Sequence, residues 1–288
     1  MNKIADTHLI LNADGSLYHL NLLPEDVADI VITVGDPDRV NQVSRYFDHI
    51  ELKKGKREFI THTGIIGRQR ISVISTGIGT DNIDIVMNEL DALVNIDLSE
   101  RTPYPQLKSL DIIRIGTSGA LQPEIPVDSL LISSAAFGMD SLMHYYVQET
   151  TKEAQQLLNN FSAIFPSGYK IDPYITSASA LLLDRFSDLA ESGITLTAPG
   201  FYSPQGRKLR VEPAVPDLLT LIRSFDAQGR KISNLEMETA GIYGMASCLG
   251  HKAISFNVIL ANRATDQFSK DPQKVMDLFI EKILEKIC

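Results

Sequence analysis

The sequence predicts an α/β protein in which residues 1–288 form a single domain. Short apolar runs typical of buried strands alternate with longer segments that carry helix patterns, and this alternation indicates a layered α/β architecture. Glycine-rich turns close several of the apolar runs. Linkers rich in Gly, Ser or Pro are absent, and so are internal repeats, so the sequence marks no domain boundary.

The first half of the chain gives clear local signals. Residues 7–12 and 16–22 are expected to form a hairpin around a turn at 13–15. Residues 30–34 are expected to form a buried strand, and Asp36-Pro37 then supplies an N-cap and a first-turn proline for a helix. The next expected elements are paired strands at 58–64 and 70–75, a helix at 83–93, and strands at 111–115 and 130–134.

The second half is expected to contain five helices and two further strands. The helices are expected near 151–161, 178–191, 214–226, 237–249 and 272–287, and the strands near 194–198 and 252–260. A strand is also expected to end, and a helix to begin, within Asn234–Gly241. These elements continue the alternation that predicts the α/β class.

Composition and charge exclude several kinds of protein. The formal net charge of −9 argues against a nucleic-acid or anionic-membrane partner, because such surfaces require a basic face. No apolar run is long enough to span a bilayer, and the first residues lack a signal-peptide pattern. Cys248 and Cys288 show no metal or redox spacing, and no metal ligand set is visible. We therefore expect a cytoplasmic protein.

The most informative segment is Asn234–Gly241, where Glu236 and Glu238 flank Met237 at the expected strand-to-helix junction. A partly desolvated carboxylate needs hydrogen-bond donors, and the vicinal hydroxyls of a ribose supply two. A methionine offers a polarizable surface that suits a sugar ring. An acidic first turn that stabilises a helix N-terminus explains the same residues equally well. The segment alone leaves both interpretations open.

Three glycine-containing turns are expected after strands, at 35–39, 77–79 and 114–119. In open α/β sheets ligands bind at the carboxyl ends of strands, and backbone N–H groups there can hold an anion. Arg39 and Arg114 belong to two of these turns and could bind phosphate oxygens, although a surface ion pair is the alternative for each. The Gly77-Ile78-Gly79 turn lacks the third glycine of a dinucleotide site, and no P-loop is present.

Eight segments, in order, resemble the nucleoside phosphorylase family, and within it the uridine phosphorylases. They are Tyr18-His19-Leu20, Gly35-Asp36-Pro37-Asp38-Arg39-Val40, Lys56-Arg57-Glu58-Phe59, Ser75-Thr76-Gly77-Ile78-Gly79, Arg114-Ile115-Gly116-Thr117-Ser118-Gly119-Ala120, Phe201-Tyr202-Ser203-Pro204-Gln205-Gly206-Arg207, Asn234-Leu235-Glu236-Met237-Glu238 and Ala261-Asn262-Arg263. The resemblance covers roughly residues 17 to 268. It implies a three-layer sandwich with a central mixed, partly barrel-like sheet flanked by helices.

The resemblance also implies a ligand site shared between subunits of a homodimer, which in many relatives belongs to a hexamer. Phosphate would be bound by Gly35, Arg39, Arg114 and Thr117, with Arg57 from the neighbouring subunit. Ribose would lie over Met237 and donate its 2′- and 3′-hydroxyls to Glu238, with Glu236 in support. His19 of the neighbour would meet the 5′-hydroxyl.

The base-binding residues implied by the resemblance favour a pyrimidine. Gln205 can donate to O2 and accept from N3–H of uracil, Arg207 can meet O4, and Phe201 would pack on the ring. Asn262 stands where bacterial purine enzymes carry a proton-donating aspartate, and an amide cannot be that acid. The expected activity is reversible phosphorolysis of uridine, with inorganic phosphate as co-substrate. Catalysis would depend on four of these residues: Arg207, Gln205, Glu238 and Arg114.

Alternatives remain at this point. A purine nucleoside phosphorylase or a nucleosidase would share the fold, and a non-catalytic nucleoside-binding protein would not need the phosphate arginines. In some relatives a monovalent cation such as potassium binds at the positions of Glu58 and the Ile78 carbonyl. Asn82 replaces the serine ligand of those relatives, which argues against the cation here. The segment 95–105 is longer than in bacterial uridine enzymes, so a dimer and a hexamer both remain open.

Overall fold

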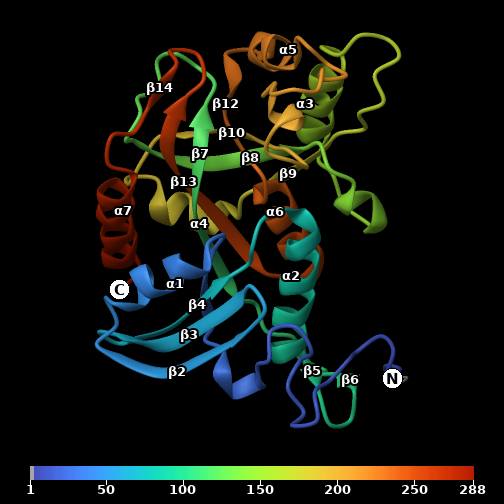
Figure 1. Cartoon of the computed structure of the whole chain (residues 1–288). Helices are drawn as coiled ribbons and strands as arrows, with labels where there is room; N and C mark the ends of the chain where they lie inside the picture. The colour runs from blue at the N-terminus through green and yellow to red at the C-terminus, as the bar shows by residue number, and fades with distance from the viewer. Residues whose placement is uncertain (1–2) are drawn as a thin grey trace.

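The computed structural model describes residues 3–288, which are organised around one mixed sheet of twelve strands (Figure 1). The strands are β1 (Ile30–Val34), β2 (His49–Lys56), β3 (Phe59–Ile66), β4 (Gln69–Ser75), β7 (Asp111–Ala120), β8 (Leu130–Gly138), β9 (Tyr174–Ser177), β10 (Ser192–Thr197), β11 (Asp226–Ala227), β12 (Arg230–Glu236), β13 (Lys252–Asn262) and β14 (Gln267–Phe268). A separate two-stranded sheet pairs β5 (Ile96–Asp97) with β6 (Thr102–Pro103).

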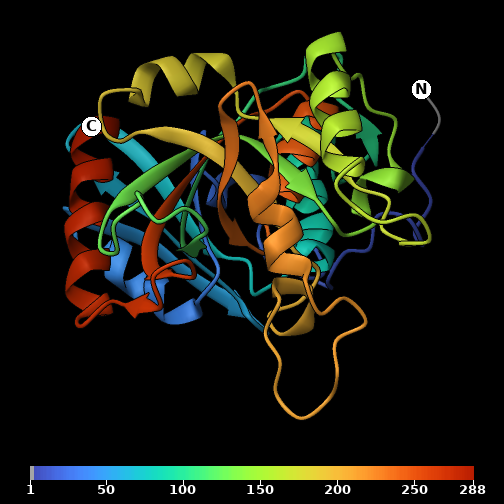
Figure 2. The same cartoon turned by 90° about the horizontal axis from the view of Figure 1, so that it is seen from above.

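Seven α-helices and three short 3₁₀ helices connect the strands within residues 3–288. The α-helices are α1 (Pro37–Ser44), α2 (Thr80–Asn95), α3 (Lys152–Ser162), α4 (Ala180–Phe186), α5 (Leu218–Ser224), α6 (Thr239–Leu249) and α7 (Pro272–Ile287). The 3₁₀ helices are η1 (Pro24–Asp26), η2 (Leu142–Tyr145) and η3 (Ser203–Gln205). The segment between η3 and α5, orange in Figure 2, extends away from the rest of the chain.

Five strands of the sheet close into a ring. β7 pairs with β13, β13 with β8, β8 with β10, β10 with β12, and β12 returns to β7. The pairs β13–β8 and β12–β7 are antiparallel and the other three are parallel, so the barrel is mixed. From β7 the sheet continues through β1, β4 and β3 to β2. The expected partly barrel-like mixed sheet is confirmed.

Helices cover both faces of this sheet. On one face α2 and α6 pack together over a core that includes Val31 and Ile112. On the other face α1, α4 and α7 pack against a core that includes Ile32 and Ile113. Because side chains alternate along a strand, neighbouring apolar residues of β1 and β7 supply opposite layers. The arrangement of helix, sheet and helix agrees with the expected three layers.

Two local predictions are wrong. In place of the predicted hairpin strands on either side of 13–15, the structure has one isolated β-bridge between Leu11 and Leu17. Side chains bind the backbone locally there: Asn12 donates to the Leu17 carbonyl at 2.8 Å, and Asp14 accepts from the Ser16 N–H at 3.0 Å. Such bonds compete with the ladder of a hairpin. Residues 116–119 do not form the predicted turn but continue β7. They remain extended because both edges of β7 are occupied, by β13 on one side and by β1 and β12 on the other.

Candidate active site

A cavity of about 740 Å³ lies at the carboxyl ends of β1, β4, β12 and β13 and beside the second half of β7. It brings together the predicted residues Gly35, Arg39, Arg114, Thr117, Phe201, Gln205, Arg207, Glu236, Met237 and Glu238. These residues come from segments more than two hundred positions apart in the chain. The position agrees with the rule that ligands bind at strand carboxyl ends in α/β sheets.

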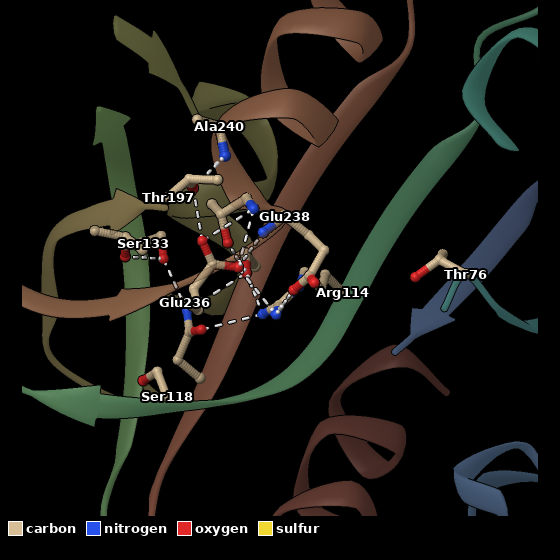
Figure 3. A network of polar contacts seen from close by, with 12 residues as sticks. Thr76, Arg114, Ser118, Ser133, Thr197, Glu236, Glu238 and Ala240 are labelled. Atoms are coloured by element: carbon tan, nitrogen blue, oxygen red, sulfur yellow. Dashed lines mark hydrogen bonds and ion pairs between the residues drawn. The ribbon is translucent and has the colours of Figure 1, made fainter. Parts of the chain in front are cut away.

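Glu236, the last residue of β12, caps helix α6. Its carboxylate accepts from the backbone N–H groups of Glu238 at 3.0 Å and Thr239 at 2.9 Å, and from the Thr197 hydroxyl at 2.6 Å (Figure 3). These donors lie at the positive end of the helix, where a carboxylate is stabilised. Of the two interpretations of segment 234–241, stabilisation of a helix N-terminus therefore applies to Glu236, whose oxygens are already bound within the protein.

Arg114 lies buried beside both carboxylates (Figure 3). Its Nη2 is 2.6 Å from Oε2 of Glu238 and 2.9 Å from Oε2 of Glu236, and its Nη1 donates to Oδ1 of Asn257 at 3.1 Å. Burial alone lowers the pKa of Arg114, but the charges of Glu236 and Glu238 raise it above its ordinary value. A Cβ at Gly116 would lie 2.0 Å from Nη1, so the guanidinium requires glycine there.

Glu238 connects two of the predicted segments. Its Oε2 accepts from Arg114, and its Oε1 accepts from the backbone N–H of Gly79 at 2.9 Å. Gly79 has a φ of 98°, a conformation that favours glycine, so the turn after β4 depends on that residue to present its N–H. Burial raises the pKa of Glu238, and the nearby charge of Glu236 adds to this while Arg114 opposes it.

The part of the cavity beside the start of α1 carries the features of an anion site. Asp36 accepts from the backbone N–H of Asp38 at 2.9 Å and caps α1, which places Arg39 in the first turn. The Nε of Arg39 is buried and has no hydrogen-bond partner among residues 3–288. Burial lowers the pKa of Arg39, so this cation gains from a negative partner. Gly35 and Thr117 line the same cavity.

Gln205 and Arg207 form the third part of the site. Oε1 of Gln205 accepts from Nη1 of Arg207 at 2.6 Å, and the Arg207 guanidinium carbon lies 3.8 Å from the centre of the Phe201 ring. Burial lowers the pKa of Arg207 to about 10, and the charge of Arg263 acts in the same direction. With a pKa of about 10, the Arg207 guanidinium keeps its proton at neutral pH. A cation in the cavity lining favours a ligand edge that is rich in acceptors or carries negative charge.

Two predicted residues lie outside this cavity of the single chain. Arg57 is exposed in the turn between β2 and β3. His19 is half-buried outside the cavity lining, and its Nδ1 lies 2.6 Å from Oε1 of Glu89. The prediction assigned both residues to the cavity of a neighbouring subunit.

Asn262 does not line the cavity either, and its side-chain amide is hydrogen-bonded to four backbone groups. It donates to the carbonyls of Gln122 at 2.9 Å and Ile125 at 2.8 Å, and it accepts from the N–H of Ala264 at 2.8 Å and Thr265 at 3.0 Å. Its hydrogen-bonding capacity is fully used.

The sequence reasoning missed Ser255 and Asn257, which accompany Arg114 in the barrel interior. A signal was present: both are polar residues at alternate positions within the otherwise apolar run 253–260, so they point to the same face. Buried polar residues in a strand must find partners, which makes them candidates for orienting an arginine.

Comparisons with known proteins agree with this geometry. A family model described as "Phosphorylase superfamily" matches residues 29–287. A uridine phosphorylase of Thermococcus kodakarensis is 30% identical over 91% of this chain and 83% of its own length. A DeoD-type purine nucleoside phosphorylase of Buchnera aphidicola is 26% identical over 93% of this chain and 98% of its own. Among solved structures, a Trypanosoma brucei nucleoside phosphorylase described as showing uridine phosphorylase activity has a TM-score of 0.85 and 28% identity, over 96% of this chain and 98% of its own.

Proposed function

This chain belongs to the phosphorylase superfamily, and from that premise we propose that it is a uridine phosphorylase, which converts uridine and phosphate reversibly to uracil and ribose 1-phosphate. One observation carries the proposal. A single cavity is lined by Arg39 and Arg114, by Gln205 and Arg207, and by Glu238 with Met237. Groups suited to phosphate, pyrimidine and ribose therefore face one space.

The reaction needs no nucleophile from the protein. A phosphate oxygen attacks C1′ of the ribose, the C1′–N1 bond breaks, and its electron pair leaves with the uracil, which then takes a proton from solvent. Arg39 and Arg114, with Gly35 and Thr117, hold phosphate against C1′, a positioning effect worth several kcal/mol of barrier. The negative charge that develops on uracil is met by Arg207 and Gln205, whose donors are in place before the reaction begins.

The sugar is held between the phosphate-binding residues and the base-binding residues. Met237 lies under the ribose ring, and Glu238 accepts from the 2′- and 3′-hydroxyls. Glu236 supports this site by holding Arg114 and the first N–H groups of α6. The charge of Glu238 also favours the cationic character that the sugar acquires as the C1′–N1 bond breaks.

The active unit in this proposal is a homodimer or a larger homo-oligomer. Arg57 and His19 lie away from the cavity of their own chain, so a neighbour supplies Arg57 to phosphate and His19 to the 5′-hydroxyl. Glu89 supports this role for His19, because it accepts from Nδ1–H and leaves Nε2 for a ligand. The proposed compartment is the cytoplasm, which suits the two free cysteines.

The proposed enzyme works without a cofactor or metal ion. Asn82 Nδ2 lies 3.3 Å from Oε1 of Glu58 and donates to it. An amide N–H directed at Glu58 does not fit a cation between them, and no step of the proposed reaction uses one.

A purine nucleoside phosphorylase is the competing function, since such an enzyme also aligns with most of this chain. The test measures base release by the purified protein from uridine and from inosine, each with and without phosphate. The proposal expects uracil from uridine only when phosphate is present, and little base from inosine. Hypoxanthine as the main product would favour the purine function, and base release without phosphate would make the protein a nucleosidase.

A further inference from the structure

Lys56 connects the two residues that the proposed shared site takes from a neighbouring subunit. It is the last residue of β2 and directly precedes Arg57. Its Nζ donates to the backbone carbonyl of Tyr18 at 2.5 Å, and Tyr18 directly precedes His19. One lysine therefore holds the segment of His19 with its side chain and is joined to Arg57 through its backbone.

The ammonium group of Lys56 is fully engaged within the protein. Besides the Tyr18 carbonyl, its partners are Oδ1 of Asn12, to which it donates at 3.0 Å, and the Tyr18 ring, whose centre lies 4.0 Å away. Nδ2 of Asn12 in turn donates to the carbonyl of Leu17 at 2.8 Å. An ammonium group has three N–H donors, and two oxygens and one ring are enough to occupy them. Lys56 thus acts on segment 12–18 and not on a ligand.

The peptide bond between Tyr18 and His19 is held at both of its polar atoms. Its carbonyl oxygen accepts from Lys56, and its N–H group donates to the carboxylate of Glu89, 3.2 Å from either oxygen. A cation at the oxygen and an anion at the N–H group match the dipole of the peptide and give charge-assisted hydrogen bonds. Because Glu89 also accepts from Nδ1 of His19, the ring is fixed together with its backbone.

The turn that carries Arg57 begins at the same lysine. Lys56 pairs with Phe59 in the ladder of β2 and β3, so Arg57 and Glu58 form the two-residue turn between the strands. Arg57 has a φ of 57°, a left-handed conformation that few residues other than glycine adopt. A backbone outlier of this kind points to a functional constraint. The direction of the Arg57 side chain depends on the end of β2, where Lys56 is anchored.

We propose that Lys56 is a positioning residue that joins Tyr18-His19 and Lys56-Arg57 into one unit, which we call the donor unit. A neighbouring subunit then presents His19 to ribose and Arg57 to phosphate in a fixed relative position. This inference rests on the shared site of the proposed function. Groups that are ordered before the ligands arrive lose less entropy on binding and hold the reactants better aligned, which is the advantage of such a unit.

The test removes the ammonium group and keeps both donated side chains. Lys56→Met retains a long apolar side chain at a half-buried position and loses the hydrogen bonds to Asn12 and Tyr18. Lys54→Met is the matched control, because Lys54 lies two residues earlier on the same face of β2 and pairs with Asp26 at 2.5 Å instead. Lys56→Arg keeps the charge and several donors.

The quantities to measure are kcat and KM for uridine and for phosphate, with melting temperatures alongside. Lys56→Met should lower kcat/KM for both substrates together, by about 10- to 100-fold, the range for lost hydrogen bonds from a charged group. Arg57→Ala should act mainly on phosphate, and His19→Ala mainly on uridine. Lys54→Met should lower the melting temperature yet keep the wild-type kinetics, and Lys56→Arg should recover part of the loss.

Subunit exchange shows on which cavity Lys56 acts. The first mixture contains equal amounts of Lys56→Met chains and Glu238→Gln chains, and the second contains wild-type chains and chains with both substitutions. Exchange should raise the uridine turnover of the first mixture, because intact cavities meet intact donor units. Exchange should lower the turnover of the second mixture, because wild-type cavities then receive the Lys56→Met donor unit.

Other results would overturn the inference. If Lys56→Met has the kinetics of Lys54→Met, Lys56 is a structural residue, and an effect on one substrate alone would separate His19 from Arg57. Constant turnover in both mixtures after complete exchange would confine Lys56 to its own chain. A wild-type protein that does not phosphorolyse uridine refutes the proposed function and this inference with it. Normal wild-type turnover that Lys56→Met leaves unchanged refutes the donor unit alone.

Discussion

The guanidinium of Arg114 donates to the carboxylate of Glu238 at 2.6 Å, and both side chains are buried. In the proposed reaction Arg114 serves phosphate and Glu238 serves ribose, so the two substrates meet at one ion pair. Each residue also has a second anchor, Asn257 for Arg114 and the Gly79 N–H for Glu238. The pair therefore holds two functional groups in a fixed geometry before any ligand arrives.

Removal of Arg114 should destabilise the protein as well as inactivate it. Arg114→Met leaves two carboxylates buried without their cation, and breaking a buried pair from one side costs roughly 3–5 kcal/mol. The double variant Arg114→Met/Glu238→Gln should be clearly more stable than the sum of the single losses predicts. Urea unfolding measures all three free energies, and strict additivity would show that Arg114 and Glu238 are not coupled.

The acidic side of the pH profile should report Glu238. Burial raises the pKa of this carboxyl above the ordinary pKa of a glutamate, which is about 4.3. The ionised form that accepts from ribose is lost as the pH falls through this raised pKa. The raised pKa has a second consequence: the native state keeps its proton to higher pH than the unfolded chain, so ionisation costs stability as the pH rises between the two values.

Glu238→Gln is the control for both effects. Its residual kcat/KM for uridine should lack the acidic limb, and the change in melting temperature across the same pH range should become smaller. Unchanged profiles in Glu238→Gln would assign the acidic limb to another group.

Replacement of Arg207 should affect turnover more than binding. Arg207→Ala removes a donor that meets charge developing on the leaving uracil, and loss of such a donor costs about 10²- to 10³-fold in kcat. The KM for uridine should rise by a much smaller factor. Steady-state kinetics separate the effect on kcat from the effect on KM. Arg207→Lys keeps the charge without the guanidinium fork, so its kcat should lie between that of the wild type and that of Arg207→Ala. A change in KM alone would reduce Arg207 to ground-state binding.

Asn262→Asp should not create a purine enzyme. The amide of Asn262 donates to two backbone carbonyls, and an ionised carboxylate at this position would face both oxygens without a proton to offer. We expect a loss of roughly 1–3 kcal/mol of stability, measured by urea unfolding, and no gain of inosine cleavage. A stable variant that cleaves inosine would show that this position reaches the base after all.

A mixing experiment tests whether the site is shared between subunits. Arg57→Ala lacks the residue that a neighbour would supply, and Glu238→Gln lacks a residue of the cavity itself. Subunit exchange between the two impaired variants should raise the uridine turnover above that of either variant alone, because some dimers contain one intact site. No recovery after exchange, checked with differently tagged chains, would mean that Arg57 acts within its own chain or not at all.

Local patterns predicted the elements that carry their own signals. β1 and α1 follow from the apolar run 30–34 and from the cap at Asp36, whose side chain does accept from the Asp38 N–H. β2 was not predicted, since its residues alternate between exposed and half-buried and include three lysines at an edge of the sheet. The closure of the barrel by β12 and β7 rests on only two residue pairs, and it was expected from the family resemblance rather than from periodicity.

The candidate site also has a part that local patterns predict and a part that they do not. Turns and acidic segments pointed to Arg39, Glu236 and Glu238 as separate candidates, each with a structural alternative. The contact of Arg114 with both carboxylates joins residues more than 120 positions apart, and no local pattern encodes it. The requirement for glycine at 116 likewise appears only once the guanidinium is placed over it. The single-domain prediction for 1–288 and the shared site remain predictions.

The attack of phosphate on C1′ can be followed directly by ³¹P NMR while the purified protein reacts with uridine and inorganic phosphate. We expect the inorganic phosphate signal to fall as a sugar 1-phosphate signal appears, in equal amount to the uracil released. Uracil release with an unchanged phosphate signal would mean that water attacks C1′. That result would contradict the roles given to Arg39, Arg57 and Arg114.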